Sequence, residues 1–303
     1  MPSIQSPLGA LPSRFRRQRV LIIGCGDIGM RVARQLTGGI RVLALTSSTE
    51  RIAPLRLAGI VPLLGNLDAP LTLRRLAGLA HRVIHLAPPA AMGSVDGRTR
   101  SLLVALRGRS KPQALVYGST SGVYGDCDGV RVTESRAVNA GTGRGQRRVD
   151  AEGRLRHWGR ATAVSTCILR IPGIYAPDRE GGTPRPRLLK ALPVLEASQD
   201  VYTNHIHADD LAQACIRALW LGRPQRVYNI CDDSDLKMGD YFDLAAGLYG
   251  LPKPPRATRA EATTLLSPMQ LSFMGESRRL VNTRMKRELG LRLRYPSVHL
   301  GLV

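Results

Sequence analysis

The run Gly24-Cys25-Gly26-Asp27-Ile28-Gly29 constrains what this chain can fold into more than any other segment. It follows a short apolar, strand-like stretch at residues 19–23 and precedes residues 30–36, which have the spacing of an amphipathic helix. In such a unit the first glycine permits a tight turn, the second lets a diphosphate approach the backbone, and the third lets helix and strand pack closely. Free N–H groups and the helix dipole also favour phosphates there. We therefore expect Gly24, Gly26, Asp27, Ile28 and Gly29 to bind a dinucleotide; an ordinary strand–helix turn is the alternative.

Strand-like and helix-like segments continue to alternate with short connections, which is typical of a parallel sheet covered by helices on both faces. Further strands are expected at residues 40–45, 59–64, 82–86, 114–117, 163–169 and 226–230. Helices are expected at residues 51–58, 71–79, 98–106, 145–158 and 208–221. The pattern predicts an α/β fold, a Rossmann-type doubly wound parallel sheet.

The alternation fades after Tyr175, where prolines begin to interrupt the chain. We expect a disordered basic tail at residues 1–17 and a dinucleotide-binding domain at 18–175, completed by 201–231. Residues 176–200 and 232–303 then form a smaller substrate-binding lobe over the carboxyl edge of the sheet, where open α/β sheets bind ligands.

Composition limits the partners of the chain. A net charge of +21 attracts anions, but no helix-turn-helix, zinc finger or RNA-binding aromatic motif accompanies it, so we expect no specific nucleic-acid partner. Association with DNA through bulk charge remains a weaker alternative. No apolar run has the length of a membrane helix, and no secretory signal is visible. The five cysteines are odd in number and never spaced C-x-x-C, which indicates no disulfide framework, no metal site and a cytoplasmic protein.

The end of the second expected strand bears on the choice of cofactor. Dinucleotide folds that prefer NAD usually carry a carboxylate there, to bind the ribose 2′-hydroxyl. This chain has Thr46-Ser47-Ser48, with Arg51 soon after. Hydroxyls and a guanidinium suit a 2′-phosphate, so Thr46, Ser47 and Arg51 favour NADP over NAD. Alternatively, Ser47 or Ser48 caps the helix that begins near Arg51.

Several later segments match one family in order and spacing. Besides residues 24–29 they are 65–68, 85–87, 118–125, 169–175, 207–212 and 228–230. Over nearly its whole length past the tail, the chain resembles the extended short-chain dehydrogenase/reductases, the NAD-dependent epimerase/dehydratase-like group.

This resemblance implies roles for further residues. Asn66 and Leu67 would lie by the adenine, Ala87 beside the cofactor, and Pro172 and Ile174 at the nicotinamide end. Thr120 would take the place of the catalytic Ser or Thr that hydrogen-bonds the reacting oxygen. His205, His207, Asp209 and Asp210 could form a metal cluster, but the resemblance favours a strand-to-helix junction whose carboxylates cap the helix and orient a loop.

One departure from the family affects its chemistry. The family uses a Tyr as acid/base and a Lys four residues later that holds the nicotinamide ribose; the matching positions here are Arg144 and Arg148. Arg148 can still bind ribose hydroxyls, whereas Arg144 cannot release a proton at neutral pH. No Tyr lies between Gly125 and Tyr175, so a shifted alignment does not restore the motif. Tyr124 or Tyr175 could donate the proton if neighbouring arginines lowered its pKa.

The sequence thus favours an atypical member, an NAD(P)-dependent oxidoreductase or epimerase-like enzyme with Thr120, Arg148 and Tyr124 as candidate catalytic residues. Ser121, Arg144, Tyr175 and Asn204 are candidate substrate contacts. Arg144, Arg147 and Arg148 place three positive charges at one end of a helix, where they repel one another. An anionic substrate or a cofactor phosphate would reduce this repulsion, and so could bulk counter-ions. The alternative is a catalytically silent NADP(H)-binding sensor or assembly protein. The resemblance also suggests a homodimer.

Overall fold

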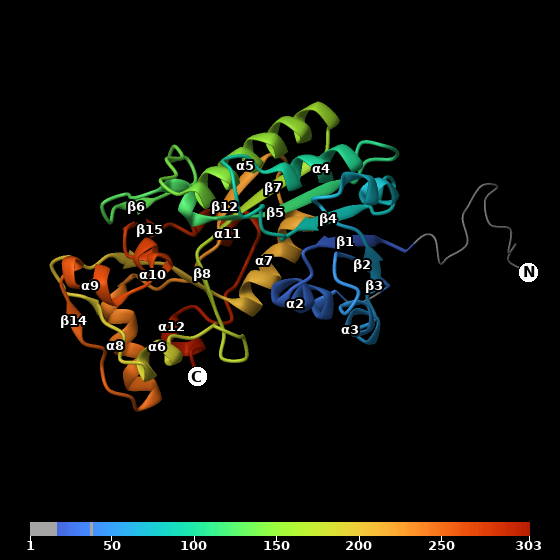
Figure 1. Cartoon of the computed structure of the whole chain (residues 1–303). Coiled ribbons are helices and arrows are strands. Elements are labelled where there is room, and N and C mark those ends of the chain that lie inside the picture. Colours follow the sequence, from blue (N-terminus) through green and yellow to red (C-terminus); the bar gives the residue numbers. More distant parts are fainter. Residues whose placement is uncertain (1–16, 37–38) are drawn as a thin grey trace, which may run out of the picture.

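The computed structural model describes residues 17–36 and 39–303, and its centre is a seven-stranded sheet (Figure 1). Along the sheet the order is β12-β7-β5-β4-β1-β2-β3, and every neighbouring pair is parallel. In chain order the strands are β1 (Arg19–Ile23), β2 (Arg41–Thr46), β3 (Val61–Leu64), β4 (Arg82–His85), β5 (Ala114–Thr120), β7 (Ser165–Ile171) and β12 (Arg226–Asn229). This order confirms the doubly wound sheet. The strand order reverses between β1 and β4, the switch point where such sheets bind ligands.

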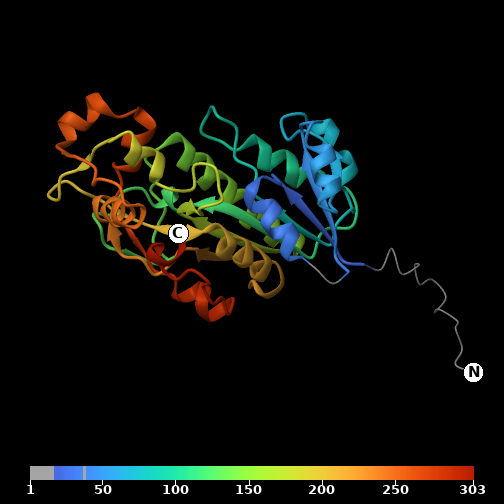
Figure 2. The ribbon, with the colours of Figure 1, turned by 90° about the horizontal axis from the view of Figure 1, so that it is seen from below.

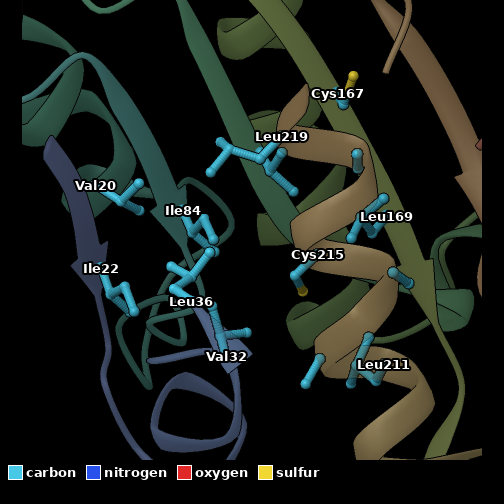
Figure 3. Packing of buried hydrophobic residues seen from close by; sticks show 14 of the residues in the cluster. Val20, Ile22, Val32, Leu36, Ile84, Cys167, Leu169, Leu211, Cys215 and Leu219 are labelled. Atoms are coloured by element: carbon cyan, nitrogen blue, oxygen red, sulfur yellow. The ribbon is translucent and has the colours of Figure 1, made fainter. Parts of the chain in front are cut away.

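One face of the sheet is covered by α2 (Asp27–Gln35), α3 (Ile52–Leu57), α7 (Ala208–Leu221) and α11 (Thr283–Glu288). Figure 3 shows Val20, Ile22 and Ile84 of the sheet facing side chains of α7. The apolar residues that point to this face alternate with those that point to the other along each strand, as burial on both sides requires.

The opposite face is covered by η1 (Pro70–Leu76), α4 (Gly97–Ala105) and α5 (Gly143–Thr162). The α-helix expected at residues 71–79 is wrong, because this segment is a 3₁₀ helix. Its buried residues Leu73 and Leu76 are three positions apart. A 3₁₀ helix repeats every three residues, so it brings both leucines onto the sheet.

A smaller lobe lies at the end of the molecule opposite β1–β3 (Figures 1 and 2). Its core joins residues of α8 (Met238–Tyr249) to Leu188, Val194 and Val201 and to α12 (Val298–Gly301). The remaining elements here are β8 (Gly173–Tyr175), α6 (Arg185–Leu189), β9 (Val194–Leu195), β10 (Tyr202–Thr203), β11 (His205–His207), β13 (Leu236–Lys237), β14 (Arg256–Ala257), α9 (Arg259–Leu265) and α10 (Pro268–Phe273).

Two segments from distant parts of the sequence meet between sheet and lobe. After β5 the chain forms a short 3₁₀ turn, η2 (Ser121–Tyr124), and then β6 (Arg131–Val132), which pairs in parallel with β15 (Arg279–Leu280). Beyond β15, Met285 and Leu289 pack in the core of the sheet, although they belong to the range that the sequence assigns to the lobe. The C-terminal part therefore serves both sheet and lobe.

Of the expected tail, only Arg17 lies within the described residues. Across the described chain, no helix combines the length and apolar character that crossing a bilayer requires.

Candidate active site

The glycine turn between β1 and α2 has the three features that its sequence predicts. Gly24 has a φ of +82°, and a Cβ there would lie 2.4 Å from the backbone nitrogen of Ala87. A Cβ on Gly29 would lie 3.2 Å from the Ile22 side chain, so helix and strand are in close contact. A Cβ on Gly26 would meet nothing within 4 Å. No side chain caps the start of α2, so its first N–H groups face this open space without a protein partner.

The carboxylate of Asp27 is held away from those N–H groups. It accepts a hydrogen bond from Arg31 Nε at 3.1 Å and lies 3.2 Å from Arg179 Nε. Arg31, which is buried, also binds Asp178 and Asp209, each at 2.6 Å. Arg31 and Arg179 thus both pair with the Asp27 carboxylate, and Arg31 is shared with two further carboxylates.

A cavity of about 770 Å³ extends from this turn, past the carboxyl ends of β5 and β7, to the lobe. It brings together most of the predicted site residues, which come from both ends of the chain. Those that line it are Gly24, Gly26, Asp27, Ile28, Gly29, Thr120, Ser121, Arg144, Arg148, Pro172, Ile174, Tyr175 and Asn204.

The remaining predicted cofactor-binding residues do not line this cavity. They are Thr46, Ser47, Arg51, Asn66, Leu67 and Ala87, which follow or end β2, β3 and β4. Arg51 donates a hydrogen bond to the carbonyl oxygen of Cys25 at 2.7 Å, which holds its guanidinium beside the turn. The alternative role of Ser47 or Ser48 as a helix cap is wrong, since the N-cap of α3 is Arg51 and no side chain caps this helix.

Thr120 and Arg148 both line the cavity near the carboxyl end of β5. Thr120 ends the strand, and its hydroxyl accepts a hydrogen bond from Gly122 N at 3.3 Å. One nitrogen of Arg148 donates to Tyr117 Oη at 3.0 Å and to the carbonyl oxygen of Gly118 at 2.6 Å. This anchor fixes the guanidinium at the cavity wall and leaves its other two nitrogens available to a ligand.

Arg144 occupies the first turn of α5, at the other side of Thr120. Its guanidinium lies 5.3 Å from the ring centroid of Phe273, which belongs to α10 of the lobe. The helix position that the resemblance assigns to the acid/base Tyr is therefore filled by a cation that contacts an aromatic ring.

Tyr124 lies beneath the cavity and does not line it. Its side chain is buried, its hydroxyl donates to Asn229 Oδ1 at 2.7 Å, and burial raises its pKa. A proton donor would need contact with the substrate and a lowered pKa. These features argue against Tyr124 as that donor.

Below Tyr124, Glu152 and Arg170 form a buried ion pair. The Arg170 side chain donates two hydrogen bonds to the Glu152 carboxylate, at 3.1 and 2.7 Å, and Ser119 Oγ donates a third at 2.7 Å. The two charged side chains are 2% and 3% exposed. This network ties α5 to the ends of β5 and β7, just below Thr120.

Tyr175 lines the cavity, but its hydroxyl is already engaged. It donates to the carbonyl oxygen of Ser297 at 3.2 Å, and burial raises its pKa well above the ordinary value. Tyr175 therefore forms part of the cavity wall, and these features argue against it as the missing acid/base residue.

The histidines and aspartates at the start of α7 cap this helix and anchor a neighbouring loop. His207 is the N-cap, and its Nδ1 accepts from Asp209 N at 3.2 Å. Asp210 accepts from the backbone of Arg294 and Tyr295 at 2.8 and 2.9 Å. The predicted loop anchor is thus formed by Asp210, whereas the cap is His207 rather than a carboxylate. Among the described residues no group of three or more His, Cys, Asp or Glu side chains is placed to hold a metal ion.

Sequence reasoning missed Arg179, Glu276 and Arg278, which also line the cavity. They lie in irregular or short segments of the lobe without a motif of their own. Only the tertiary structure brings them to the cavity.

Comparisons with known proteins agree with this architecture. The profile of the NAD dependent epimerase/dehydratase family matches residues 20–231. No curated protein matches the chain in sequence. Among solved structures, a functionally unknown conserved protein from Silicibacter pomeroyi is 27% identical, with a TM-score of 0.75 and coverage of 94% of this chain and 96% of that chain.

Two more distant structures share the fold. One is MoeE5 in complex with UDP-glucose and NAD, at 22% identity and a TM-score of 0.74, covering 94% of this chain and 96% of that chain. The other is UDP-glucuronic acid 4-epimerase from Bacillus cereus in complex with UDP-glucuronic acid and NAD, at 19% identity and a TM-score of 0.76, with the same coverage.

Proposed function

Because the chain belongs to the NAD dependent epimerase/dehydratase family, we propose that it is an NAD(P)-dependent oxidoreductase or epimerase-like enzyme that acts on an anionic small molecule. One observation carries this proposal: a single cavity joins the open glycine turn to Thr120 and to the lobe. A cofactor bound at the turn and a substrate bound by the lobe would therefore meet at the end of β5.

The residues at the turn fit a dinucleotide. The open face of Gly26 and the uncapped N–H groups of α2 would take the diphosphate, and Arg148 would take hydroxyls of the nicotinamide ribose. Ala87, Pro172 and Ile174 would flank the cofactor. When bound, the nicotinamide supplies hydride acceptance and return, while the chain supplies orientation.

We further propose that NADP is preferred to NAD, although the structural neighbours are NAD complexes. The support is the set of groups at the end of β2, where Thr46, Ser47 and Arg51 offer hydroxyls and a guanidinium. Asn66 and Leu67 would lie by the adenine. Arg51→Glu should weaken NADP binding at least tenfold and leave NAD binding within threefold.

An anionic substrate fits the charge of the cavity. Its lining contains the five arginines 144, 148, 179, 187 and 278 but only two carboxylates, Asp27 and Glu276. Thr120 and Ser121 would contact the reacting oxygen, with Arg144 and Tyr175 as further substrate contacts. Asn204 contributes as a support, since both ends of its amide bind backbone groups of residues 278 and 280.

A catalytically silent cofactor-binding protein is the second proposal, and the cation Arg144 at the acid/base position favours it. Thermal-shift measurements with NAD, NADH, NADP and NADPH test the cofactor site in both proposals. Incubation with UDP-glucose and UDP-glucuronic acid, followed by chromatography of products, then separates them. Binding without any product would favour the silent protein, and absence of stabilisation by all four nucleotides would overturn both.

The remaining proposals concern the cellular compartment, the oligomeric state and DNA association. The five cysteines are buried and free, which supports a reducing cytoplasm. A homodimer is proposed from the family resemblance, and DNA association is expected to be weak and steeply dependent on salt.

A further inference from the structure

Glu276 lies where a proton acceptor for the reaction is needed. It lines the cavity and belongs to the segment between α10 and β15. Its Oε2 atom lies 4.0 Å from the point that a Cβ on Gly122 would occupy. Thr120 Oγ1 lies 3.7 Å from the same point. The carboxylate and the hydroxyl therefore border one small volume at the end of β5.

The backbone around Glu276 is held firmly against the loop that follows β5. Ser277 N donates to Asp126 Oδ1 at 2.7 Å, and the carbonyl oxygen of Ser277 accepts from Cys127 N at 3.0 Å. Asn204 binds the next residues through both ends of its amide. Because these bonds fix the residues that directly follow Glu276, the position of Glu276 near Thr120 is part of the fold.

A neighbouring cation, Arg278, contacts the Glu276 carboxylate. Arg278 donates to Glu276 Oε2 at 2.6 Å and to the carbonyl oxygen of Gly125, also at 2.6 Å. The Glu276 side chain is 15% exposed, so a ligand in the cavity can reach it. The contact of its carboxylate with Arg278 uses Oε2, which leaves Oε1 available to accept a proton.

Four other titratable groups that line the cavity, Tyr175, Tyr241, His205 and Asp27, are less suited to this task. The Tyr175 hydroxyl is bound to Ser297, and burial raises the pKa of Tyr241 as well. Burial lowers the pKa of His205 to about 4, and its ring is stacked on Tyr241 at 4.2 Å between centroids. The other carboxylate, Asp27, lies at the glycine turn and is held there by two arginines.

We propose that Glu276 is the acid–base residue of this enzyme, in place of the Tyr that α5 lacks; this inference rests on the proposed function. When the substrate carbinol is oxidised, the proton of its hydroxyl would pass to the Glu276 carboxylate, and a bound oxidised nicotinamide would accept the hydride from its carbon and so become reduced. The carbon–oxygen bond becomes a carbonyl that Thr120 hydrogen-bonds. Return of the proton from Glu276, together with the hydride, restores an alcohol.

The test compares the parent protein with Glu276→Gln, Glu276→Asp and Glu196→Gln. Gln keeps an acceptor for Arg278 but removes the charge and the proton site, whereas Asp keeps a carboxylate. Glu196 lies in the lobe outside the cavity, so Glu196→Gln is the matched control. The first readout is the ratio of the dissociation constants of NAD and NADH. A carboxylate near the reacting centre favours the positively charged ring of NAD. The second readout is turnover of UDP-glucose and UDP-glucuronic acid.

We expect Glu276→Gln to have the melting temperature of the parent and a dissociation constant for NADH within threefold of the parent's. Its affinity for NAD relative to NADH should fall at least threefold. Turnover of either sugar nucleotide should fall at least a hundredfold in kcat, with KM within threefold, and Glu276→Asp should recover part of it. An unchanged NAD/NADH ratio, or turnover within threefold of the parent, overturns the role of Glu276 while the proposed function stands. If the parent binds no nicotinamide nucleotide, the proposed function fails and this inference fails with it.

Discussion

Replacement of Gly26 by valine should abolish cofactor binding without unfolding the protein. A Cβ at this position meets no atom within 4 Å, so the new side chain projects into open space at the start of α2. That space is the approach to the N–H groups of Asp27 and Ile28, which no side chain caps. The valine therefore competes with the diphosphate and with nothing else in the fold.

The size of the effect follows from the two N–H groups that lose their ligand. Hydrogen bonds to a charged group each contribute about 1.5–3 kcal/mol, so losing both weakens binding by at least about 3 kcal/mol, or roughly a hundredfold. At a nucleotide concentration of a hundred times the dissociation constant, the parent gains about 2.7 kcal/mol, and the variant gains about 0.4 kcal/mol. For a chain of this length these values correspond to melting shifts of about 5 °C and less than 1 °C.

The assay is thermal shift with and without NADP and NAD. Gly153→Val is the control, because Gly153 is an exposed helical glycine of α5 whose Cβ also meets nothing within 4 Å. It should respond to nucleotide like the parent. Gly24→Ala should instead melt far lower even without nucleotide, since its Cβ would clash with the backbone of Ala87 at a φ of +82°. Stabilisation of Gly26→Val equal to that of the parent would refute the assignment of the turn.

Three further changes test the framework around the site. Glu152→Ala leaves the buried Arg170 guanidinium unpaired and should cost about 3–5 kcal/mol of unfolding free energy in urea titrations; a loss below 1 kcal/mol would contradict the pair's role. Burial raises the pKa of Asp232 to about 7, so between about pH 4 and 7 the native state keeps a proton that the unfolded chain has released, and stability falls as pH rises. Asp232→Asn should remove this slope and be more stable than the parent at pH 8, by roughly 1–4 kcal/mol, and equal slopes would refute this. Tyr124→Phe should retain nucleotide binding and turnover and lose about 1 kcal/mol of stability, because its hydroxyl bond to Asn229 and its interaction with Arg170 disappear; loss of turnover at full stability would return Tyr124 to the reaction.

Local patterns were sufficient for most of the sheet. Each of the seven strands is present within a few residues of its expected bounds, because a buried parallel strand needs a short apolar run between turn residues. The prediction of an α-helix at 71–79 was wrong for a related reason. The leucines at 73 and 76 satisfy both a 3.6-residue and a three-residue repeat, and only contact with the sheet selected the tighter turn.

The sequence also determined the dinucleotide turn and the absence of the family's Tyr, since both depend on residues that are neighbours along the chain. It could not show that Tyr124 points beneath the cavity, nor that Asn204 binds the backbone near Glu276. Thr120 and Glu276 are more than 150 positions apart, and a short strand pair joins their surroundings. The conformation of a turn is set by its own few dihedral angles, so it can be read locally. The surroundings of an ionisable group depend on which distant segments pack against it, and only the complete fold decides that.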